Sequence, residues 1–274
     1  MFELKILYIW DQAGVGCILA KYLRRHGNDV KILMRSGFDS FAIFSFYNES
    51  LIDIDGKNFL KLSVKAAKNY DIIHIHSLFK IVPELRRKYK DKRIILHYHG
   101  SEVRGKEDNV DPIRLDAEHK SDVILVSTPD LLNYVKNEKA QYFPNPVDTE
   151  HFKKPSFSVS PEKSLMIVYN RMDMQWTTDY LSNNNFNPAS YTIIDRSSNP
   201  ILYSQLPTVL QQYSIYVDIK YIDGLLLTSL SKTAIEALAC GLKVLAHNLQ
   251  YKEGLPEVNE PECVVDRVQK LYRM

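Results

Sequence analysis

The sequence predicts an α/β protein made of two Rossmann-like domains, and three observations support this fold class. Short apolar runs recur along the 274 residues and alternate with stretches of helical character. These runs are apolar on both faces, which is typical of parallel strands that helices cover on each side. The alternation is interrupted once, near residues 143–163, and then resumes, so two doubly wound halves are expected.

The first domain is expected to comprise residues 1–152. It opens with an apolar strand at residues 6–10, a helix at 17–26 that Gly27 closes, and a second strand at 30–34. A strand, a helix and a parallel strand form a right-handed βαβ unit. The same rhythm predicts further strands at 72–76, 93–99 and 122–126, with a basic helix across residues 80–93 between the first two.

The second domain is expected to comprise residues 153–274 and to be reduced in size. Its first residues, 153–163, contain two prolines and three serines and are typical of a linker. Residues 170–190 are rich in Asn and Thr, where a full-size domain would carry a long helix. A closing helix at 263–273 is expected to pack back toward the first domain. Strands are predicted at 164–169, 191–194, 214–219 and 242–246, and a helix at 232–240.

The composition is that of an ordinary globular protein, with 45% hydrophobic and 25% charged residues. A formal net charge of +2 gives no indication of a nucleic-acid partner. The three cysteines, Cys17, Cys240 and Cys263, are far apart and form no zinc spacing, which favours a reduced intracellular protein. No apolar run approaches the ~20 residues of a membrane span, and the start resembles a strand rather than a signal peptide. We therefore expect a soluble, cytoplasmic protein, which could also associate peripherally with the inner face of the membrane.

The most informative segment is 231–245, which combines a polar turn, a short helix, a glycine stop and a buried strand. Ser231, Lys232 and Thr233 begin the helix, whose free amides and positive dipole end suit a diphosphate. Glu236 follows about one turn later, where a carboxylate could accept hydrogen bonds from ribose hydroxyls. It could equally do no more than complement the helix dipole, and the residue types alone leave both interpretations open.

Several segments, taken in chain order, resemble one known family. Residues 236–244, E-A-L-A-C-G-L-K-V, are similar to the E-A-(M/L)-A-C-G-x-P-V signature of the retaining "group 1" glycosyltransferases, which are family 4-like and have the GT-B fold of two Rossmann-like domains facing each other across a cleft. Residues 143–152 resemble the P-N-G-V-D-x-x-x-F segment of that family. The other matching elements are Gly14-x-Gly16, Asp71–His76, His99–Glu102, Ser121–Ser127 and Asn170–Arg171.

The resemblance implies a nucleotide sugar in the cleft, with its nucleotide on the second domain and the acceptor on the first. Glu236 would then hold the ribose, and Arg171 would meet the diphosphate. His99 would face the transferred sugar, and the loop of Gly14 and Gly16 would lie near the donor phosphate. His99 and Glu236 are therefore the candidate catalytic residues. The resemblance also implies retention by front-face attack with no metal and no cofactor, because cationic side chains and helix-end amides neutralise the diphosphate.

The chain departs from the family at the donor site. Thr228 occupies the position of the first Glu of the E-x7-E motif, which normally contacts the donor sugar. Residues 174–177 lack the Lys that the family carries there, and Lys220 or Lys232 could replace it. The resemblance is therefore to a shortened member of the family with divergent donor-site motifs.

The resemblance favours a hexosyltransferase of glycan biosynthesis that acts on a glycan or a lipid-linked acceptor. Two alternatives remain open. A non-catalytic subunit that binds a sugar nucleotide would explain Thr228 and the missing Lys. A GT-B-type nucleotide-sugar 2-epimerase would need carboxylates as acid and base, for which Glu102 and Asp11 are the candidates.

Two further features allow more than one interpretation. Residues 80–93 contain seven basic and two acidic residues, which predicts either contact with an anionic membrane or a solvated helix face. His74 and His76 share one face of a strand, and so do His97 and His99. Zinc binding is the less favoured interpretation of these pairs, because no cysteine or third ligand lies near either pair in the sequence. Strand ends that point toward a ligand cleft are favoured instead.

Overall fold

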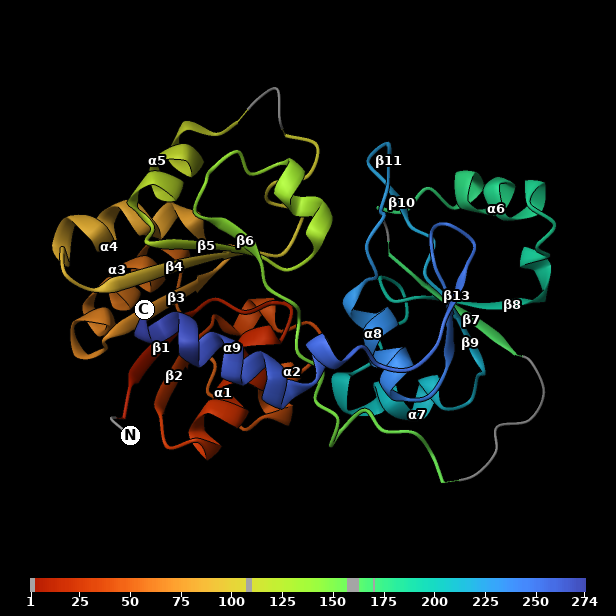
Figure 1. Ribbon diagram of the computed structural model, residues 1–274, viewed down its shortest axis with the longest axis horizontal. Helices are drawn as coiled ribbons and strands as arrows, with labels where there is room; N and C mark the ends of the chain where they lie inside the picture. Colours follow the sequence, from red (N-terminus) through yellow and green to blue (C-terminus); the bar gives the residue numbers. More distant parts are fainter. Residues whose placement is uncertain (1–2, 107–109, 157–162, 170) are drawn as a thin grey trace. The chain divides into compact units, whose positions relative to one another are not determined.

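The computed structural model describes residues 3–106, 110–156, 163–169 and 171–274. The chain divides into two compact units, each with its own sheet of mainly parallel strands (Figure 1). The first unit contains Met1–Pro146 together with Pro261–Met274, and the second contains Val147–Glu260. The α/β class with Rossmann-like units that the sequence predicts is confirmed.

The first unit is built on a six-stranded sheet in which every strand pair is parallel. Its strand order is β2-β1-β3-β4-β5-β6. The chain adds β2 on one side of β1 and the later strands on the other, so the point at which the strand order reverses lies between β1 and β3. The strands are β1 (Lys5–Ile9), β2 (Asp29–Leu33), β3 (Ile72–His76), β4 (Arg93–Tyr98), β5 (Val123–Val126) and β6 (Ala140–Tyr142).

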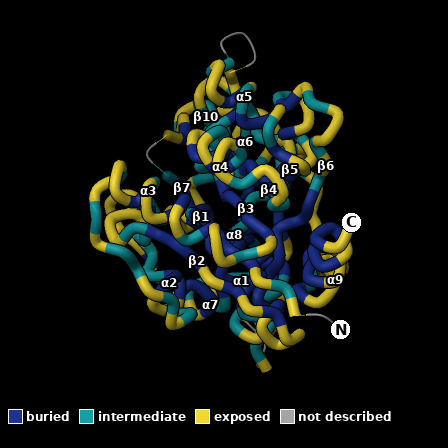
Figure 2. Tube along the Cα trace, turned by 90° about the vertical axis from the view of Figure 1, so that its left-hand side faces the viewer, coloured by how far each residue is buried: buried dark blue, intermediate teal, exposed yellow. Residues whose placement is uncertain are grey.

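Helices cover both faces of this sheet, and Figure 2 shows its central strands as buried. On one face, Leu7, Ile73 and Leu96 pack with side chains of the helices α3 (Gly56–Ala66), α4 (Val82–Lys88) and α5 (Pro112–Lys120). Because successive strand residues point to opposite faces, Tyr8 and His74 point to the other face. That face carries α1 (Val15–Arg25) and α9 (Pro261–Arg273), and the short helix α2 (Ile43–Phe46) completes the unit.

The last helix, α9, belongs to the first unit although the whole second unit precedes it in the chain. It packs on α1, and it buries Val264, Val265, Val268 and Tyr272. The Tyr272 hydroxyl lies 2.9 Å from the Tyr8 hydroxyl of β1. The spacing of its apolar residues gives α9 one buried face and one exposed face.

The second unit has a five-stranded sheet of order β13-β12-β9-β7-β8. The chain again changes direction across the sheet, here between β7 and β9, and only the β12–β13 pair is antiparallel. The strands are β7 (Ser164–Val168), β8 (Tyr191–Asp195), β9 (Ile215–Val217), β12 (Lys243–Leu245) and β13 (Tyr251–Lys252), and β10 (Tyr221–Ile222) and β11 (Leu225–Leu226) form a separate hairpin. The helices are α6 (Met174–Asn183), α7 (Leu206–Leu210) and α8 (Lys232–Ala239).

The division between the units falls after Pro146, earlier than the expected boundary at residue 152. Residues 147–152 are anchored in the second unit. The Val147 amide donates to the Asn259 carbonyl at 3.0 Å, and the Phe152 ring lies 5.4 Å from that of Tyr203. Most of the expected linker, residues 157–162, lies outside the described residues.

The expected basic helix across residues 80–93 is wrong in its extent, because α4 ends at Lys88 and Arg93 already belongs to β4. Arg86 stabilises the turn that ends the helix by donating to the carbonyls of Lys90 at 2.8 Å and Lys92 at 3.0 Å. It also pairs with Asp122 at 2.5 Å, so it does not contribute to a free basic face.

Among the described residues, no helix is both long and apolar enough to cross a membrane.

Candidate functional site

In the first sheet, the strand order reverses between β1 and β3. The residues that follow these two strands have unusual backbone conformations. Parallel α/β sheets bind ligands at the carboxyl ends of their strands, where the strand order reverses. Trp10, directly after β1, has φ 68°, and Ser77, directly after β3, has φ 58°. Left-handed backbone at non-glycine residues is strained and is frequent at functional sites. This edge of the first unit is therefore its candidate site.

Four histidines gather near this edge on the sheet face that α1 and α9 cover. The rings of His74 and His76 stack with centroids 4.5 Å apart, and those of His97 and His99 lie 4.4 Å apart. The two pairs meet because β3 and β4 are neighbours with His76 in register with His97. His76 Nδ1 lies 2.9 Å from His99 Nε2, and His74 Nε2 lies 3.3 Å from His97 Nδ1.

Burial keeps the inner three of these imidazoles neutral. It lowers the pKa of His76 to about 3, and it lowers the pKa of His74 and of His97 well below the ordinary value. The neighbouring imidazoles lower the pKa of His74 and His97 further, because a second charge in the cluster would be repelled. His99 is half-buried and is the member of the cluster nearest to solvent.

Gly14 and Gly16 lie at the start of α1. A side chain of the protein already accepts a hydrogen bond from one of the backbone amides there. Gly14 is the left-handed residue before the helix, with φ 72°. Asp11, buried at 1% exposure, accepts a hydrogen bond from the Cys17 amide at 2.8 Å. A Cβ on Gly16 would lie 3.1 Å from Asp11 Oδ2 and 3.3 Å from His76 Nε2, so any larger residue would press against both side chains.

Glu102 holds the turn that carries His99. Its carboxylate accepts hydrogen bonds from the amides of His99 and Gly100, the latter at 3.0 Å, and from the Ser77 hydroxyl at 2.8 Å. With these three donors, the carboxylate orients His99 and is poorly placed to exchange a proton with a substrate. The sequence resemblance placed Glu102 in this segment, but only the structure assigns it this contact.

In the second unit, the corresponding edge lies at the ends of β7 and β9 and at the start of α8. Asp218 directly follows β9 and is buried. It accepts hydrogen bonds from the Ser231 hydroxyl at 2.6 Å and the Ser231 amide at 2.8 Å. Ser231 in turn caps α8, because its hydroxyl accepts from the Ala234 amide at 3.2 Å. Asp218 therefore fixes the position of the helix end.

Glu236 lies one turn into α8, with its side chain 4% exposed. Its Oε1 forms an ion pair with Lys232 Nζ at 3.1 Å and has no hydrogen-bond partner. The Lys232 ammonium also lies over the Tyr203 ring, 5.3 Å from its centroid. The structure thus brings Ser231, Lys232, Thr233 and Glu236 together on the first turns of one helix.

Lys220, which could have replaced the missing family lysine, is buried with Asp218. Its Nζ lies 3.1 Å from Asp218 Oδ1. Burial is the largest single influence and lowers the pKa of Lys220, but Asp218, Tyr216 and Tyr169 together outweigh it, so the pKa is raised. Tyr169 lies against the same group, with Lys220 Nζ 5.5 Å from its ring and a side-chain hydrogen bond to Thr233. Lys220 is therefore a permanent cation behind the start of α8.

Arg171 pairs with a residue of the β10–β11 hairpin rather than with α8. It is more than half exposed and pairs with Asp223 at the turn of the β10–β11 hairpin. Asn170, which precedes it in the family motif, lies outside the described residues. Thr228 is exposed between the hairpin and α8.

The structure therefore separates the predicted residues into two groups, one in each unit. Gly14, Gly16 and His99 lie at one edge of the first sheet, and Ser231, Lys232, Thr233 and Glu236 lie at one edge of the second. Asp218 is a functional candidate that the motifs did not predict. Its signal was available, because a carboxylate directly after an apolar parallel strand lies at the edge where ligands bind.

Comparison with known proteins gives a family match for residues 17–151 and a similar fold for the chain. Residues 17–151 match the family model described as Glycosyltransferase Family 4. Among solved structures, a UDP-N-acetylglucosamine 2-epimerase is similar with a TM-score of 0.52 and 10% identity, over 98% of this chain and 87% of that one. A Listeria monocytogenes protein assigned as a UDP-N-acetylglucosamine 2-epimerase has a TM-score of 0.50 and 13% identity, over 100% and 89%.

Among curated proteins, none is similar enough in sequence to count as a relative. The structural similarities lie at low identity, and what they have in common with this chain is the fold. The family match and the two parallel sheets agree with the resemblance read from the sequence motifs. Residues 17–151 of this chain are therefore similar to glycosyltransferase family 4, and the chain has the GT-B-like fold of two Rossmann-like units.

Proposed function

We propose that this chain transfers a hexose-type sugar from a nucleotide-diphosphate donor to a glycan or lipid-linked acceptor, with retention and without a metal ion. The observation that supports this most is the start of α8, where the buried Glu236 carboxylate faces Lys232 and accepts no hydrogen bond at Oε1. Such a carboxylate can accept hydrogen bonds from ribose hydroxyls. The adjoining helix amides and Lys232 can neutralise a diphosphate.

In this proposal each unit has a separate task. Ser231, Lys232, Thr233 and Glu236 bind the nucleotide, and Arg171 meets the diphosphate after leaving Asp223. His99 contacts the transferred sugar, and the neutral His76 behind it positions its ring. Gly14 and Gly16 allow close approach to the start of α1, where Asp11 already accepts one amide.

A non-catalytic, sugar-nucleotide-binding subunit is the second candidate, and two observations favour it. Thr228 is exposed where the family carries a donor-binding Glu, and Lys220 is held by Asp218 rather than free for a phosphate. The 2-epimerase alternative has less support. Glu102 accepts three hydrogen bonds and Asp11 is buried with one, so neither is well placed as an acid or base.

One experiment tests the transferase proposal against both alternatives. The protein is incubated with a panel of UDP-, GDP- and ADP-sugars, with and without a lipid or oligosaccharide acceptor, and nucleotide binding and release are measured. Acceptor-dependent release supports a transferase, interconversion of donors supports an epimerase, and binding without turnover supports the subunit. If no nucleotide binds at all, the assignment of the α8 site is wrong.

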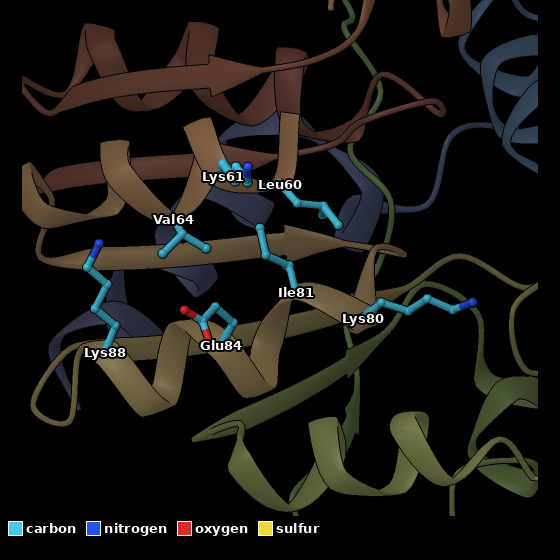
Figure 3. A pocket seen from close by; sticks show the side chains of 7 residues that line it. All are labelled: Leu60, Lys61, Val64, Lys80, Ile81, Glu84 and Lys88. Carbon is cyan, nitrogen blue, oxygen red and sulfur yellow. The ribbon is translucent and has the colours of Figure 1, made fainter. Parts of the chain in front are cut away.

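We also propose that the first unit contacts an anionic, amphipathic acceptor through a pocket between α3 and α4. The cavity of about 440 Å³ has an apolar floor that includes Leu60, Val64 and Ile81 (Figure 3). Lys61, Lys80 and Lys88 line its rim, together with Glu84.

The charges at this rim favour an anion. Glu84 pairs with Arg87 at 2.6 Å, which offsets its negative charge. Lys61, Lys80 and Lys88 form no salt bridge with any described residue. An apolar floor with lysines along its edge suits an acyl chain with a phosphate headgroup. This pocket replaces the long basic helix as the basis for the proposed membrane contact.

A further inference from the structure

The three inner imidazoles of the first unit form a cluster that sugar transfer does not by itself require. His74, His76 and His97 are 0–1% exposed. One nitrogen from each lies within 4.8 Å of the nitrogens of the other two. Three buried histidines in contact are costly to a protein, because each ring carries polar atoms that need partners away from water.

We propose that His74, His76 and His97 bind one late first-row divalent ion, for which Zn²⁺ is the probe. Three neutral imidazoles are ligands that Zn²⁺, Co²⁺ and Ni²⁺ accept readily, whereas Mg²⁺ and Ca²⁺ require oxygen. Three protein nitrogens on a tetrahedral ion leave its fourth position to a small molecule such as water. The sequence alone disfavours zinc because it shows no third ligand near either histidine pair, and the pairing of β3 with β4 supplies that ligand.

The individual nitrogens fit this assignment. His74 Nε2 and His97 Nδ1 are 3.3 Å apart, which is longer than most hydrogen bonds between such groups. Two nitrogens bound at ~2.0–2.1 Å to a tetrahedral ion lie about 3.3 Å apart. His76 Nε2 has no hydrogen-bond partner, and neither has His97 Nε2. The nitrogen of His76 lies within 4.8 Å of the other two, so ion binding requires this ring to move closer to them.

The groups behind the three rings would orient them as ligands. Metal-binding histidines usually donate their second ring N–H to a fixed partner. His74 Nδ1 lies 2.7 Å from the Tyr272 hydroxyl, which in turn contacts Tyr8 at 2.9 Å. His76 Nδ1 lies 2.9 Å from His99 Nε2. With an ion at its Nε2, His76 would carry its proton at Nδ1 and donate it to His99.

The local charge also favours an ion. The charge of a buried divalent ion needs an anion nearby. Asp11 is buried, its Oδ1 has no partner, and its Oδ2 and His76 Nε2 both lie within 3.3 Å of where a Gly16 Cβ would be.

The test is metal binding by the whole protein after dialysis against a chelator. We expect Zn²⁺ to bind with one equivalent per chain and to raise the melting temperature. Co²⁺ should give the visible absorption of a four-coordinate ion, and X-ray absorption of the Zn²⁺ form should show a nitrogen shell with imidazole scattering. His74→Phe and His97→Phe should each weaken Zn²⁺ binding by more than about 100-fold, since even groups behind a ligand change affinity by 10–100-fold.

The matched control is His119→Phe, which changes an exposed histidine on α5 and should bind Zn²⁺ as the unchanged protein does. The proposal is overturned if the folded, unchanged protein binds no Zn²⁺ stoichiometrically. It is also overturned if X-ray absorption shows an ion held mainly by oxygen or sulfur. The absorption spectra use the unchanged chain, so they decide the matter even if a variant fails to fold.

Discussion

His76 Nδ1 lies 2.9 Å from His99 Nε2, and the two rings stack with 10° between their planes. His76 is fully buried, whereas His99 is half-buried. A neutral, enclosed imidazole in this position determines which nitrogen of the outer ring carries a proton. The orientation of His99, the member of the cluster nearest to solvent, therefore depends on a buried neighbour.

His76→Phe should lower turnover while leaving donor binding nearly unchanged. Phenylalanine keeps the stacked ring but cannot hold His99 by a hydrogen bond, and misplacing a group near the reacting atoms by ~1 Å can cost about 100-fold in rate. Steady-state kinetics should show a fall in kcat with little change in KM for the nucleotide sugar. His119→Phe on the surface serves as the control, and equal kcat in both variants would remove His76 from the positioning role.

Glu236→Gln should weaken nucleotide binding, because glutamine keeps the shape but loses the charge that strengthens hydrogen bonds to ribose hydroxyls. We expect a loss of about 1–3 kcal/mol in binding free energy, measured by calorimetry with nucleoside diphosphates. Glu257→Gln, an exposed change in the same unit, is the control and should bind normally. Unchanged affinity of the Glu236 variant for every nucleotide, at an unchanged melting temperature, would contradict the ribose assignment.

Turnover should survive EDTA and need neither Mg²⁺ nor Mn²⁺. Lys232 and the free amides at the start of α8 can neutralise the diphosphate that a divalent ion neutralises in other transferases. The measurement is initial rate in chelator, followed by addition of each ion. A loss that Mg²⁺ or Mn²⁺ restores would contradict the proposal, whereas a loss that only Zn²⁺ restores would point to the three histidines.

Vesicles that contain acidic lipid should bind the protein, and salt should release it. Each well-placed lysine contributes ~1 kcal/mol near such a surface, so changing Lys61, Lys80 and Lys88 to Ser should cost roughly 3 kcal/mol. Flotation at low and physiological salt measures this, since the Debye length shortens to ~8 Å.

The matched control for the vesicle experiment changes three exposed lysines elsewhere, Lys31, Lys136 and Lys252, to Ser. It removes the same net charge but leaves the pocket between α3 and α4 intact. If both triple variants lose binding equally, general charge rather than this pocket attracts the membrane. If the unchanged protein ignores acidic vesicles at low salt, the lysines are only a solvated rim.

Cys263 should be the cysteine that alkylates in the native protein at pH 8. It is exposed, whereas Cys17 and Cys240 are buried. Burial, with a smaller effect of Glu236, raises the pKa of Cys240 to about 12, so its thiol stays protonated and unreactive. Mass spectrometry should find one modified cysteine in the native chain and three after unfolding, and Cys263→Ser should abolish native labelling. Native labelling of Cys240 would show that the back of α8 is more open than described.

The sequence pattern predicted most elements because local rules govern them. Apolar runs bounded by polar turns located the strands, and the Ser cap with the following Gly located α8 to within a residue. The helix expected across residues 80–93 was too long. Periodic basic residues continue through the turn after Lys88, and only the contacts of Arg86 with distant carbonyls reveal that the helix stops.

The candidate sites were predictable in part. The start of α8 carried its own signal, since Ser231 to Glu236 are neighbours in the chain. The histidine cluster did not, because it depends on which strands pair and in which register. His76 meets His97 only because β4 lies beside β3, and His74 meets Tyr272 only because α9 returns across 198 positions of sequence. A single sequence contains neither the strand order nor this return.

The position of α9 has a consequence for how the chain is made. The sheet of the first unit is synthesised early, yet the helix that covers Tyr8 and His74 leaves the ribosome only after the whole second unit. Until then, one face of a finished sheet exposes the surface that Val264, Val265 and Leu271 later occlude. Contacts so distant in sequence form slowly, and exposed apolar surface invites association with other chains. During translation, one face of the first unit's sheet therefore lacks α9 from before the second unit is made. That face is covered only once the residues of α9 have emerged.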